Sequence, residues 1–473
     1  MFSRALTRQV SVRFIRCNSS LPEGSTELPI CVRDLVQDAP AIGQSIKING
    51  WVKSSRVSKN VAFVDLVDGT TDQDVKCVIR PPSLLPKDVS TGAGVQIAGV
   101  WSQGKGKQSH EIQVTSDPGS AVKVLGSVEE LYPLQKRNHT SQFLRTIPEY
   151  RWRVPEAGAT LRLGSRLESA LTSFFDTNSF YKTHPPMVTS SDCEGAGELF
   201  RVESASKLSS KEQFFGKEAY LTVSTQLHLE VLSAALGRVW TLSPCFRAEE
   251  SDTNRHLSEF WMLEAEISFV ETVDQLTRFS EAMLRHVGQR LLQHGESGLP
   301  EIAKARWEML AHGKYTQITY TEAIDLVQRN SELFTTVPQW GSGLGSEHEK
   351  WLAGEHFKGP VFVVDYPVEE KPFYMKKNTD GKTVACYDLL IPDIGELIGG
   401  SVREHDLQKL ELEMAARKMD AGPLTWYLNL RKNGSVPHGG FGLGFERLLQ
   451  YLSGADNIRD TIPFPRAANQ CTC

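Results

Sequence analysis

The sequence predicts an α+β protein, in which a small β-barrel precedes a larger domain of strands and helices. Five short runs of alternating apolar and polar residues lie between residues 28 and 122, separated by turn residues. Two further alternating runs flank residues 246–260, and a helical pattern of apolar residues follows the glycine-rich segment 438–444. At 473 residues, the chain is long enough for two or three domains with sizeable cores.

The composition narrows the class of protein. A formal net charge of −5 argues against a generally basic surface for binding nucleic acid, so any RNA contact must come from local patches. The eight cysteines include no C-x-x-C pair, which argues against a zinc site or a disulfide framework and favours a reducing compartment. No apolar run approaches the roughly 20 residues needed to span a bilayer.

Residues 1–22 differ from the rest of the chain and have the composition of a mitochondrial transit peptide. Four arginines alternate with apolar residues, serine and threonine are frequent, and the first acidic residue is Glu23. A disordered basic tail is the alternative interpretation. We expect this segment to be removed and the working protein to lie in the mitochondrial matrix.

The five runs within residues 28–122 suit an OB-fold, a five-stranded barrel whose open face binds single-stranded nucleic acid. Phe63 is the candidate stacking platform, and Arg56 is a candidate contact to the nucleic acid. Taken singly, an exposed phenylalanine or a loop cation is more often ordinary surface. A basic linker over residues 123–155 is expected next. The predicted strands are 46–52, 61–67, 75–79, 95–101 and 112–114.

The segment 246–260 joins two strands that each alternate strictly. Arg247 and Glu249 end the polar face of the first strand, while Glu264 and Glu266 share the polar face of the second. Two such strands side by side would present an arginine and several carboxylates on one face of a rigid β-sheet. This suits a ligand carrying both charges, such as ATP together with an amino acid. A surface hairpin laced with salt bridges is the alternative.

The glycine-rich segment 438–444 leads into a predicted amphipathic helix. Its glycines allow the backbone to approach a ligand closely. Arg447 would lie in the first helical turn, where the helix N-terminus favours an anion. Alone this is a weak signal, because a plain tight turn gives the same pattern.

Several segments resemble known motifs. Residues 246–267, FRAEESDTNRHLSEFWMLEAEI, and residues 438–449, HGGFGLGFERLL, resemble motifs 2 and 3 of the class II aminoacyl-tRNA synthetases. The first of them looks specifically like the asparaginyl-tRNA synthetases. The amphipathic pattern over residues 163–175, followed by residues 181–187, resembles motif 1 at the dimer interface of that class. Residues 50–66 resemble the anticodon-binding domain of the aspartyl and asparaginyl enzymes.

The resemblance covers nearly everything from residue 28 to 466 and is weakest over 274–360, where helical packing and a capping box from Thr319 to Glu322 are expected. It implies a class II catalytic domain over residues 156–473, built on an antiparallel sheet flanked by helices, and a homodimer. It further implies an asparagine–tRNA ligase, which uses ATP and Mg²⁺ to join L-asparagine to tRNA(Asn) through asparaginyl adenylate, for mitochondrial protein synthesis.

The resemblance also assigns site residues position by position. Arg247, Arg447 and Glu396 would be catalytic. Asp388 and Glu396 match the magnesium positions, and a sparse pair is sufficient because Mg²⁺ keeps several waters and bridges phosphates. The implied ATP-binding residues are Arg247, Glu249, His256, Phe260, Glu396, Gly444 and Arg447. The implied asparagine-binding residues are Glu194, Ser224, Gln226, Leu229, Glu264 and Arg403, and the implied anticodon-binding residues are Arg56, Phe63 and Lys76. Ser224 and Gln226 are expected on the polar face of one strand, together with Tyr220 and Thr222.

Amino-acid choice depends on three of these positions. Leu229 stands where aspartyl enzymes carry a lysine, and an apolar residue cannot pair a buried carboxylate, so aspartate should be rejected. Glu264 can accept a hydrogen bond from a side-chain amide but repels a carboxylate. Arg403 would bind the amide oxygen. In the barrel, Lys76 replaces a glutamine that usually reads the middle anticodon base, so the mode of uracil recognition should differ.

Three alternatives remain open at this stage. An aspartyl-tRNA synthetase is the nearest, and Leu229 with Glu264 argues against it. An ammonia-dependent asparagine synthetase shares the class II core but is expected to lack the barrel. A non-enzymatic RNA-binding relative should have lost some of the charged positions Arg247, Glu396, Arg403 and Arg447, all of which are present.

Overall fold

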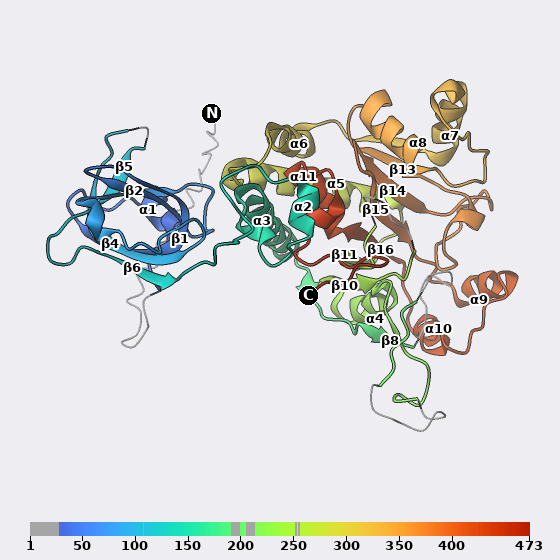
Figure 1. Ribbon diagram of the computed structural model, residues 1–473. Helices are drawn as coiled ribbons and strands as arrows, with labels where there is room; N and C mark the ends of the chain where they lie inside the picture. Colours follow the sequence, from blue (N-terminus) through green and yellow to red (C-terminus); the bar gives the residue numbers. More distant parts are fainter. Residues whose placement is uncertain (1–27, 107, 191–198, 205–212, 251–252, 254–255) are drawn as a thin grey trace, which may run out of the picture. The chain divides into compact units, whose positions relative to one another are not determined.

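The computed structural model describes residues 28–473 apart from positions 107, 191–198, 205–212, 251–252 and 254–255 (Figure 1). The chain forms two compact units, each with its own hydrophobic core. The first holds the described residues up to Asp68 together with Gln73–Glu130, and the second holds Gly69–Asp72 and Leu131–Cys473. The predicted transit peptide lies outside the described residues.

The first unit contains the predicted barrel. All five predicted strands are present, and pairing of β1 with β4 closes the order β1-β2-β3-β5-β4. Neighbours are antiparallel except β3 and β5, which run parallel. Helix α1, Val32–Gln37, and the 3-10 turn η1, Pro82–Leu84, belong to the same unit. The strands are β1 Ser45–Val57, β2 Ala62–Val67, β3 Val75–Ile79, β4 Gly94–Gln103, β5 His110–Val114 and β6 Ala121–Gly126.

Strand β6 was not predicted. It pairs antiparallel with β4, and its side chains Val122 and Val124 pack against the barrel core. The sheet therefore continues to Gly126, past the predicted end of the barrel at residue 122 and into the range expected to be linker. The strand is short, and only two of its side chains, Val122 and Val124, point inward. An alternation with two inward residues is a weak signal in the sequence.

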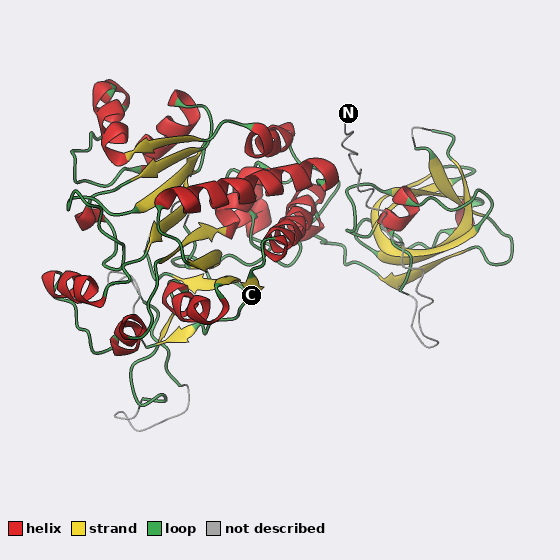
Figure 2. Cartoon of the chain, turned by 180° about the vertical axis from the view of Figure 1, so that it is seen from behind, coloured by secondary structure: helices red, strands yellow, loops and turns green. Residues whose placement is uncertain are grey.

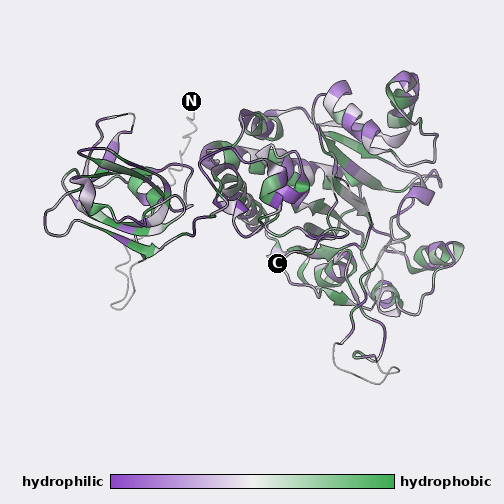
Figure 3. Ribbon diagram, in the orientation of Figure 1, coloured by the Kyte–Doolittle hydropathy of each residue, from purple (hydrophilic) through white to green (hydrophobic). Residues whose placement is uncertain are grey.

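The second unit is built on the predicted antiparallel sheet flanked by helices. Its eight strands run in the order β12-β13-β14-β15-β16-β11-β10-β7, with parallel pairs only at the two edges. Strand β13 is buried along its whole length and is correspondingly hydrophobic (Figure 3). The strands are β7 Tyr181–Lys182, β10 Arg238–Phe246, β11 Glu259–Ser268, β12 Thr316–Thr319, β13 Val361–Val364, β14 Cys386–Ile391, β15 Gly395–Val402 and β16 His438–Gly444, and a separate pair is formed by β8 Val188–Thr189 and β9 Tyr220–Leu221.

Four helices pack on one face of this sheet and form the main core, namely α3 Pro155–Thr177, α5 Val273–His294, α6 Glu301–His312 and α11 Phe445–Ser453. The longest of them, α3 and α5, lie in front of the strands in the view of Figure 2. The other helices are α2 Ser141–Arg145, α4 Gln226–Leu236, α7 Tyr320–Arg329, α8 Ser346–Trp351, α9 Leu407–Ala416 and α10 Thr425–Lys432, and the remaining short turns are η2 Arg151–Arg153, η3 Ser331–Leu333, η4 Leu352–His356, η5 Val368–Glu370 and η6 Ile458–Asp460.

The two faces of the sheet differ in chemistry, and the strand register shows how. One face is apolar, where Leu242, Leu263 and Leu443 lie side by side in the core. On the opposite face Glu264 is paired with Thr241 on β10 and with Gly442 on β16. The members of this second face on the four central strands include Met262, Glu264, Glu266, Gly440, Gly442, Gly444, Gly399, Ser401 and Asp388. Four of these positions are glycines, so the polar candidate residues on this face have few large side chains beside them.

Two expectations about local structure were wrong. Gln226 was predicted on a strand with Ser224, but β9 ends at Leu221 and Gln226 is the first residue of α4. The Ser224 hydroxyl accepts a hydrogen bond from the Gln226 backbone N–H at 3.2 Å, which helps turn the chain into the helix. Arg247 and Glu249 were expected on the polar face of the first strand, but β10 ends at Phe246 and both lie in the loop that follows it.

Other local expectations are confirmed. The Thr319 hydroxyl accepts from the Glu322 backbone N–H and caps α7, as predicted. The amphipathic pattern over 163–175 forms α3, and all its apolar positions are buried within the unit. Among the residues that the structure describes, no helix is long and apolar enough to cross a membrane.

Candidate active site

The seven residues predicted to bind ATP line one cavity on the polar face of the sheet. They lie in the loop after β10, in β11, in β15, and at the junction of β16 with α11. The cavity is also lined by Leu257, Met262, Leu397, Gly442, Glu446 and Ile458. The structure therefore brings residues that are distant in sequence together around one cavity.

Cationic and aromatic groups surround this cavity. The Arg247 guanidinium lies over the Phe260 ring, 5.7 Å from its centroid. Arg447, in the first turn of α11, donates to the Glu396 backbone oxygen at 3.1 Å and lies 3.9 Å from the Glu396 carboxylate. His256 adds an imidazole to the same wall. An aromatic ring with two guanidiniums and an imidazole suits a base carrying a polyphosphate.

Glu446 was missed by sequence analysis. It is 3% exposed, lines the cavity and accepts hydrogen bonds from the Trp261 backbone N–H at 3.0 and 3.2 Å. Burial raises the pKa of its carboxyl group to about 7. A glutamate in the first turn of a helix is usually exposed, where the helix dipole favours its charge. The sequence therefore gave no signal for a buried acid.

The predicted magnesium pair converges on Gly399. A Cβ built there would lie 3.3 Å from Glu396 Oε1 and 3.6 Å from Asp388 Oδ1, so the absent side chain leaves room between the two carboxylates. The Lys371 ammonium donates to both oxygens of Asp388, at 2.6 and 2.8 Å. Burial raises the pKa of Asp388, while Lys371 lowers it. The donors fit a cation with few protein ligands, and Glu396 is the more exposed of the two.

Three of the predicted asparagine-binding residues, Ser224, Gln226 and Glu264, are linked by hydrogen bonds, whereas Glu194 lies outside the described residues. Ser224 donates its hydroxyl to Glu264, and the Thr225 backbone N–H donates to the same carboxylate at 2.9 Å. The Thr225 hydroxyl also donates to Glu264. Glu264 is 3% exposed. It is therefore a fully hydrogen-bonded buried carboxylate next to the start of α4, which carries Gln226 and Leu229.

Arg403 follows β15 and is held by two neighbours. Its guanidinium pairs with Glu266 at 2.9 Å, and its Nη1 donates to the Ser401 hydroxyl at 2.6 Å. Burial alone would lower its pKa, but Glu266 outweighs this and raises it. The pKa of Glu266 is raised by burial, against the effect of Arg403. This pairing fixes the plane of the guanidinium predicted to read the substrate amide.

A second buried group was missed entirely. Glu230 on α4 contacts Tyr427 and Arg431 on α10 and His438 on β16, and the side chains of Glu230 and Arg431 are both 0% exposed. Burial favours the neutral acid, but Arg431 and His438 hold the pKa of Glu230 below its ordinary value. In the sequence these positions look like ordinary helix and loop residues. A charged side chain is rarely buried without partners, and only the fold shows which residues are the partners.

This group includes a possible set of metal ligands. Among the described residues, Glu230, Glu266 and His438 are the one set of three with ligand atoms within 4.8 Å of one another. Arg431 and Arg403 already pair with the two carboxylates, at 2.5 and 2.9 Å. Two guanidiniums thus supply the positive charge that a metal ion would bring.

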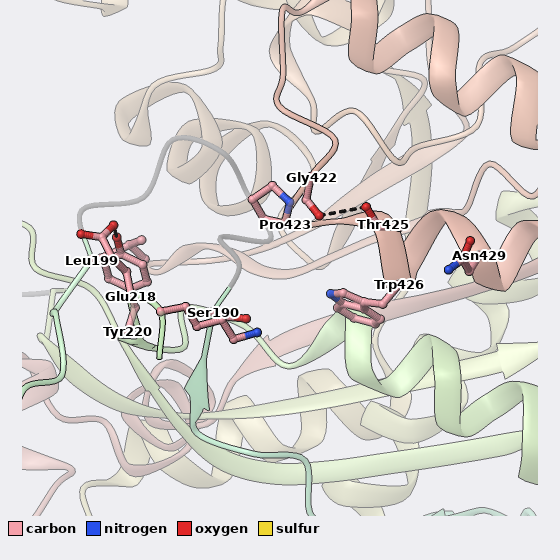
Figure 4. A pocket seen from close by; sticks show the side chains of 10 residues that line it. Ser190, Leu199, Glu218, Tyr220, Gly422, Pro423, Thr425, Trp426 and Asn429 are labelled. Carbon is pink, nitrogen blue, oxygen red and sulfur yellow. Dashed lines mark hydrogen bonds between the residues drawn. The ribbon is translucent and has the colours of Figure 1, made fainter. Parts of the chain in front are cut away.

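A further cavity lies on the outer side of α10 (Figure 4). Trp426 and Asn429 face it, whereas Tyr427 and Arg431 are directed inward to Glu230. Thr425 donates to the Gly422 backbone oxygen at 2.9 Å at the start of the helix. The helix therefore separates this outer cavity from the buried group.

In the barrel, the predicted anticodon-binding residues share one face. Phe63 stands opposite Arg56 in the β1–β2 register, and the Arg56 guanidinium lies 5.0 Å from its ring centroid. Ala62, Val64 and Leu66 point to the core, so Phe63, which is half-buried, points outward. Lys76 lies opposite Asp65 on the same face, 3.7 Å from its carboxylate. Phe63 is therefore not a core residue.

Comparison with known proteins gives consistent results. A family model described as tRNA synthetases class II (D, K and N) matches residues 145–468. The chain is 48% identical to the mitochondrial asparagine–tRNA ligase of Saccharomyces cerevisiae over 455 residues, which cover 89% of this chain and 92% of that protein. It is 42% identical to the asparagine–tRNA ligase of Oleidesulfovibrio alaskensis, over 91% of this chain and 96% of that protein. The crystal structure of asparaginyl-tRNA synthetase from Pyrococcus horikoshii complexed with asparaginyl-adenylate matches with a TM-score of 0.83 at 29% identity, over 95% of this chain and 100% of that chain.

Proposed function

Because the chain belongs to the asparagine–tRNA ligases, within the class II tRNA synthetases (D, K and N), we propose that it joins L-asparagine to tRNA(Asn) for mitochondrial protein synthesis. The reaction consumes ATP and passes through asparaginyl adenylate. The single observation that carries this proposal is the cavity lined by Arg247, Glu249, His256, Phe260 and Arg447. Gly442, which also lines it, is the cross-strand partner of the buried Glu264.

The chemistry of activation needs positioning and charge stabilisation rather than a protein nucleophile. The asparagine carboxylate attacks the α-phosphate, where Arg247 stabilises the developing charge. Pyrophosphate leaves toward His256 and Arg447. Phe260 stacks on adenine, with Glu249 beside it. The terminal ribose hydroxyl of the tRNA, the 3′-OH in this class, then attacks the carbonyl carbon of the adenylate, and AMP leaves as the ester forms.

Asp388 and Glu396 would hold Mg²⁺, since both carboxylates approach the open space at Gly399. When bound there, the ion would neutralise phosphate oxygens. Lys371 keeps the Asp388 carboxylate oriented through two hydrogen bonds. Arg417 in turn donates to the Lys371 backbone oxygen at 2.8 Å, which holds the backbone of Lys371 in place.

The homodimer and the location in the mitochondrial matrix belong to the same proposal. Tyr181, Met187 and Val188, in and next to the segment that resembles motif 1, are exposed on this single chain, at 59, 45 and 38%. Exposed apolar side chains gathered in one segment suit a contact between copies. The matrix location is supported by the composition of residues 1–22 and by the mitochondrial relative.

The direct test of this function is pyrophosphate exchange measured with asparagine and with aspartate in parallel. We expect exchange with asparagine and at least about 100-fold lower kcat/KM with aspartate, because a buried carboxylate would face Glu264 without a cation contributed by position 229. Equal exchange with both amino acids would contradict the proposed specificity. No exchange with either would contradict the function.

Replacing Leu229 by lysine tests the source of this specificity. Leu229 is buried in the first turns of α4, at 1% exposure. An ammonium introduced there should reduce kcat/KM for asparagine by roughly 10-fold or more, because an unpaired buried charge is costly. Aspartate activation should rise only weakly, since Glu264 still repels a carboxylate. Leu229→Met, which keeps an apolar side chain of similar volume, is the control. Unchanged asparagine kinetics in the lysine variant would contradict the assignment.

Replacing Phe63 by alanine tests the barrel face. Stacking of a base on an aromatic ring is worth about 1–3 kcal/mol, so aminoacylation of tRNA with a GUU anticodon should fall by roughly one to two orders of magnitude. Pyrophosphate exchange without tRNA should hardly change. Val57→Ala, at an exposed position next to Arg56 in β1, should leave both activities intact. A parallel fall of exchange and aminoacylation would show that Phe63 supports the fold instead.

A further inference from the structure

The carboxylate of Glu230 contacts one residue of the proposed asparagine site, Gln226, from behind. It accepts from Gln226 Nε2 at 3.1 Å on its own helix. It also accepts from the Tyr427 hydroxyl at 2.9 Å and from Arg431 Nη2 at 2.5 Å, and His438 Nε2 lies 3.0 Å away. Glu230 is 1% exposed, so these groups satisfy it in place of water.

The contact with Gln226 fixes which way that amide faces. An ionised carboxylate can only accept hydrogen bonds, so the amide nitrogen must point at Glu230 and the amide oxygen must point away from it. The remaining contacts prevent Glu230 from turning aside, because Tyr427 and Arg431 hold the same carboxylate from α10. The amide of Gln226 is therefore locked in one of its two orientations.

The locked orientation suits one part of the substrate. An amino acid presents an ammonium group, which donates hydrogen bonds and cannot accept them. The free amide oxygen of Gln226 is an acceptor, whereas its NH₂ group would repel that ammonium. Ser224 connects this amide to the rest of the site, because its hydroxyl accepts from the Gln226 backbone N–H at 3.2 Å and donates to Glu264.

We propose that Glu230 is a positioning residue for asparagine activation, which orients the Gln226 amide so that its oxygen receives the α-ammonium group of the substrate. The inference rests on the proposed function and deepens it, since a buried residue would position the side chain that binds the amino group of the substrate. Glu230 touches neither substrate nor ATP and acts through Gln226. Arg431 and Tyr427 act one step further back, by holding Glu230.

The test replaces Glu230 by glutamine, which keeps the size of the side chain but can present either an oxygen or an NH₂ group to Gln226. Asparagine-dependent pyrophosphate exchange gives KM and kcat for the full-length enzyme, and competitive inhibition by succinamic acid, which is asparagine without its amino group, gives a second affinity. The KM for asparagine should rise roughly 10- to 100-fold, the factor expected for a hydrogen bond to a charged group. The inhibition constant of succinamic acid and the KM for ATP should change less than about threefold.

A matched control separates positioning from stability. Glu296 is another buried carboxylate paired with arginines, Arg162 at 2.9 Å and Arg166 at 3.1 Å, and it lies after α5, outside the candidate site. Glu296→Gln should lower the melting temperature as Glu230→Gln does and leave the KM for asparagine unchanged. If Glu230→Gln alone does not fold, the double variant Glu230→Gln/Arg431→Gln, which leaves no unpaired buried charge, is measured in the same way.

The outcomes are distinct. A loss of asparagine affinity with unchanged succinamic acid binding supports the inference. Equal losses for both compounds, or no loss for either, overturn it, since Glu230 would then serve only the fold. A wild-type enzyme without asparagine-dependent exchange would instead overturn the proposed function.

Discussion

Replacing Arg247 or Arg447 by alanine is expected to reduce asparagine-dependent pyrophosphate exchange by roughly 10²–10³-fold, the loss typical of removing one charge-stabilising donor from a reacting group. Both guanidiniums line the same cavity, Arg247 over Phe260 and Arg447 beside Glu396. The fold should survive, because neither residue belongs to the main hydrophobic core. The measurement is the exchange rate at saturating asparagine, with circular dichroism to confirm the folded state.

A surface arginine provides the comparison for this experiment. Arg290 is exposed on α5, on the helix-covered side of the sheet, and its replacement by alanine should leave exchange within a factor of two or so, as for most surface changes. Exchange near the wild-type rate in both cavity variants would refute the assignment of this cavity to ATP. A fall in all three variants would indicate a general effect on the enzyme rather than a local one.

Among the variants proposed here, Gly440→Ala should lower the free energy of unfolding the most. The added Cβ would lie 2.1 Å from Glu266 Oε2 and 2.2 Å from the Ala265 backbone oxygen. The latter is part of the pairing between β11 and β16, so it cannot retreat without opening the sheet. We expect a destabilisation of about 3 kcal/mol or more, at the upper end for overpacking, and little folded protein in thermal unfolding experiments.

Gly442 is a matched control on the same strand and the same face. A Cβ there would meet Met262 Sδ at 3.2 Å, and the end of a flexible methionine side chain can move aside. Gly442→Ala should therefore change the melting temperature only slightly. Equal melting temperatures for the two variants would disprove the claim that the backbone oxygen of Ala265 leaves no room at Gly440.

Local patterns predicted much of the fold because they are physical requirements of each element. The alternation around residues 246–260 gave β10 and β11, and the capping box at Thr319 gave the start of α7. The pattern failed at Gln226, where a serine hydroxyl turns the chain into a helix after a strand of only two residues. Alternating residues cannot reveal such a change, since the same letters fit a longer strand.

The candidate site was predicted in part for a similar reason. Residues inside recognisable motifs, such as Arg247 and Arg447, could be named because neighbouring letters mark them. Glu230 and Glu446 could not, because their importance comes from burial, and burial depends on which distant segments pack around them. The pairing of Lys371 with Asp388, 17 residues apart, likewise follows only from the turn between η5 and β14.

The main hydrophobic cluster of the larger unit is separate from the cluster of the barrel, which has a consequence for folding cooperativity. A two-state transition requires that the loss of one part of a core undermine the rest. Among the described residues no side chain belongs to both of these clusters, so we expect each unit to have a free energy of unfolding of its own. Thermal unfolding is therefore expected in two steps, one for the barrel and one for the larger unit.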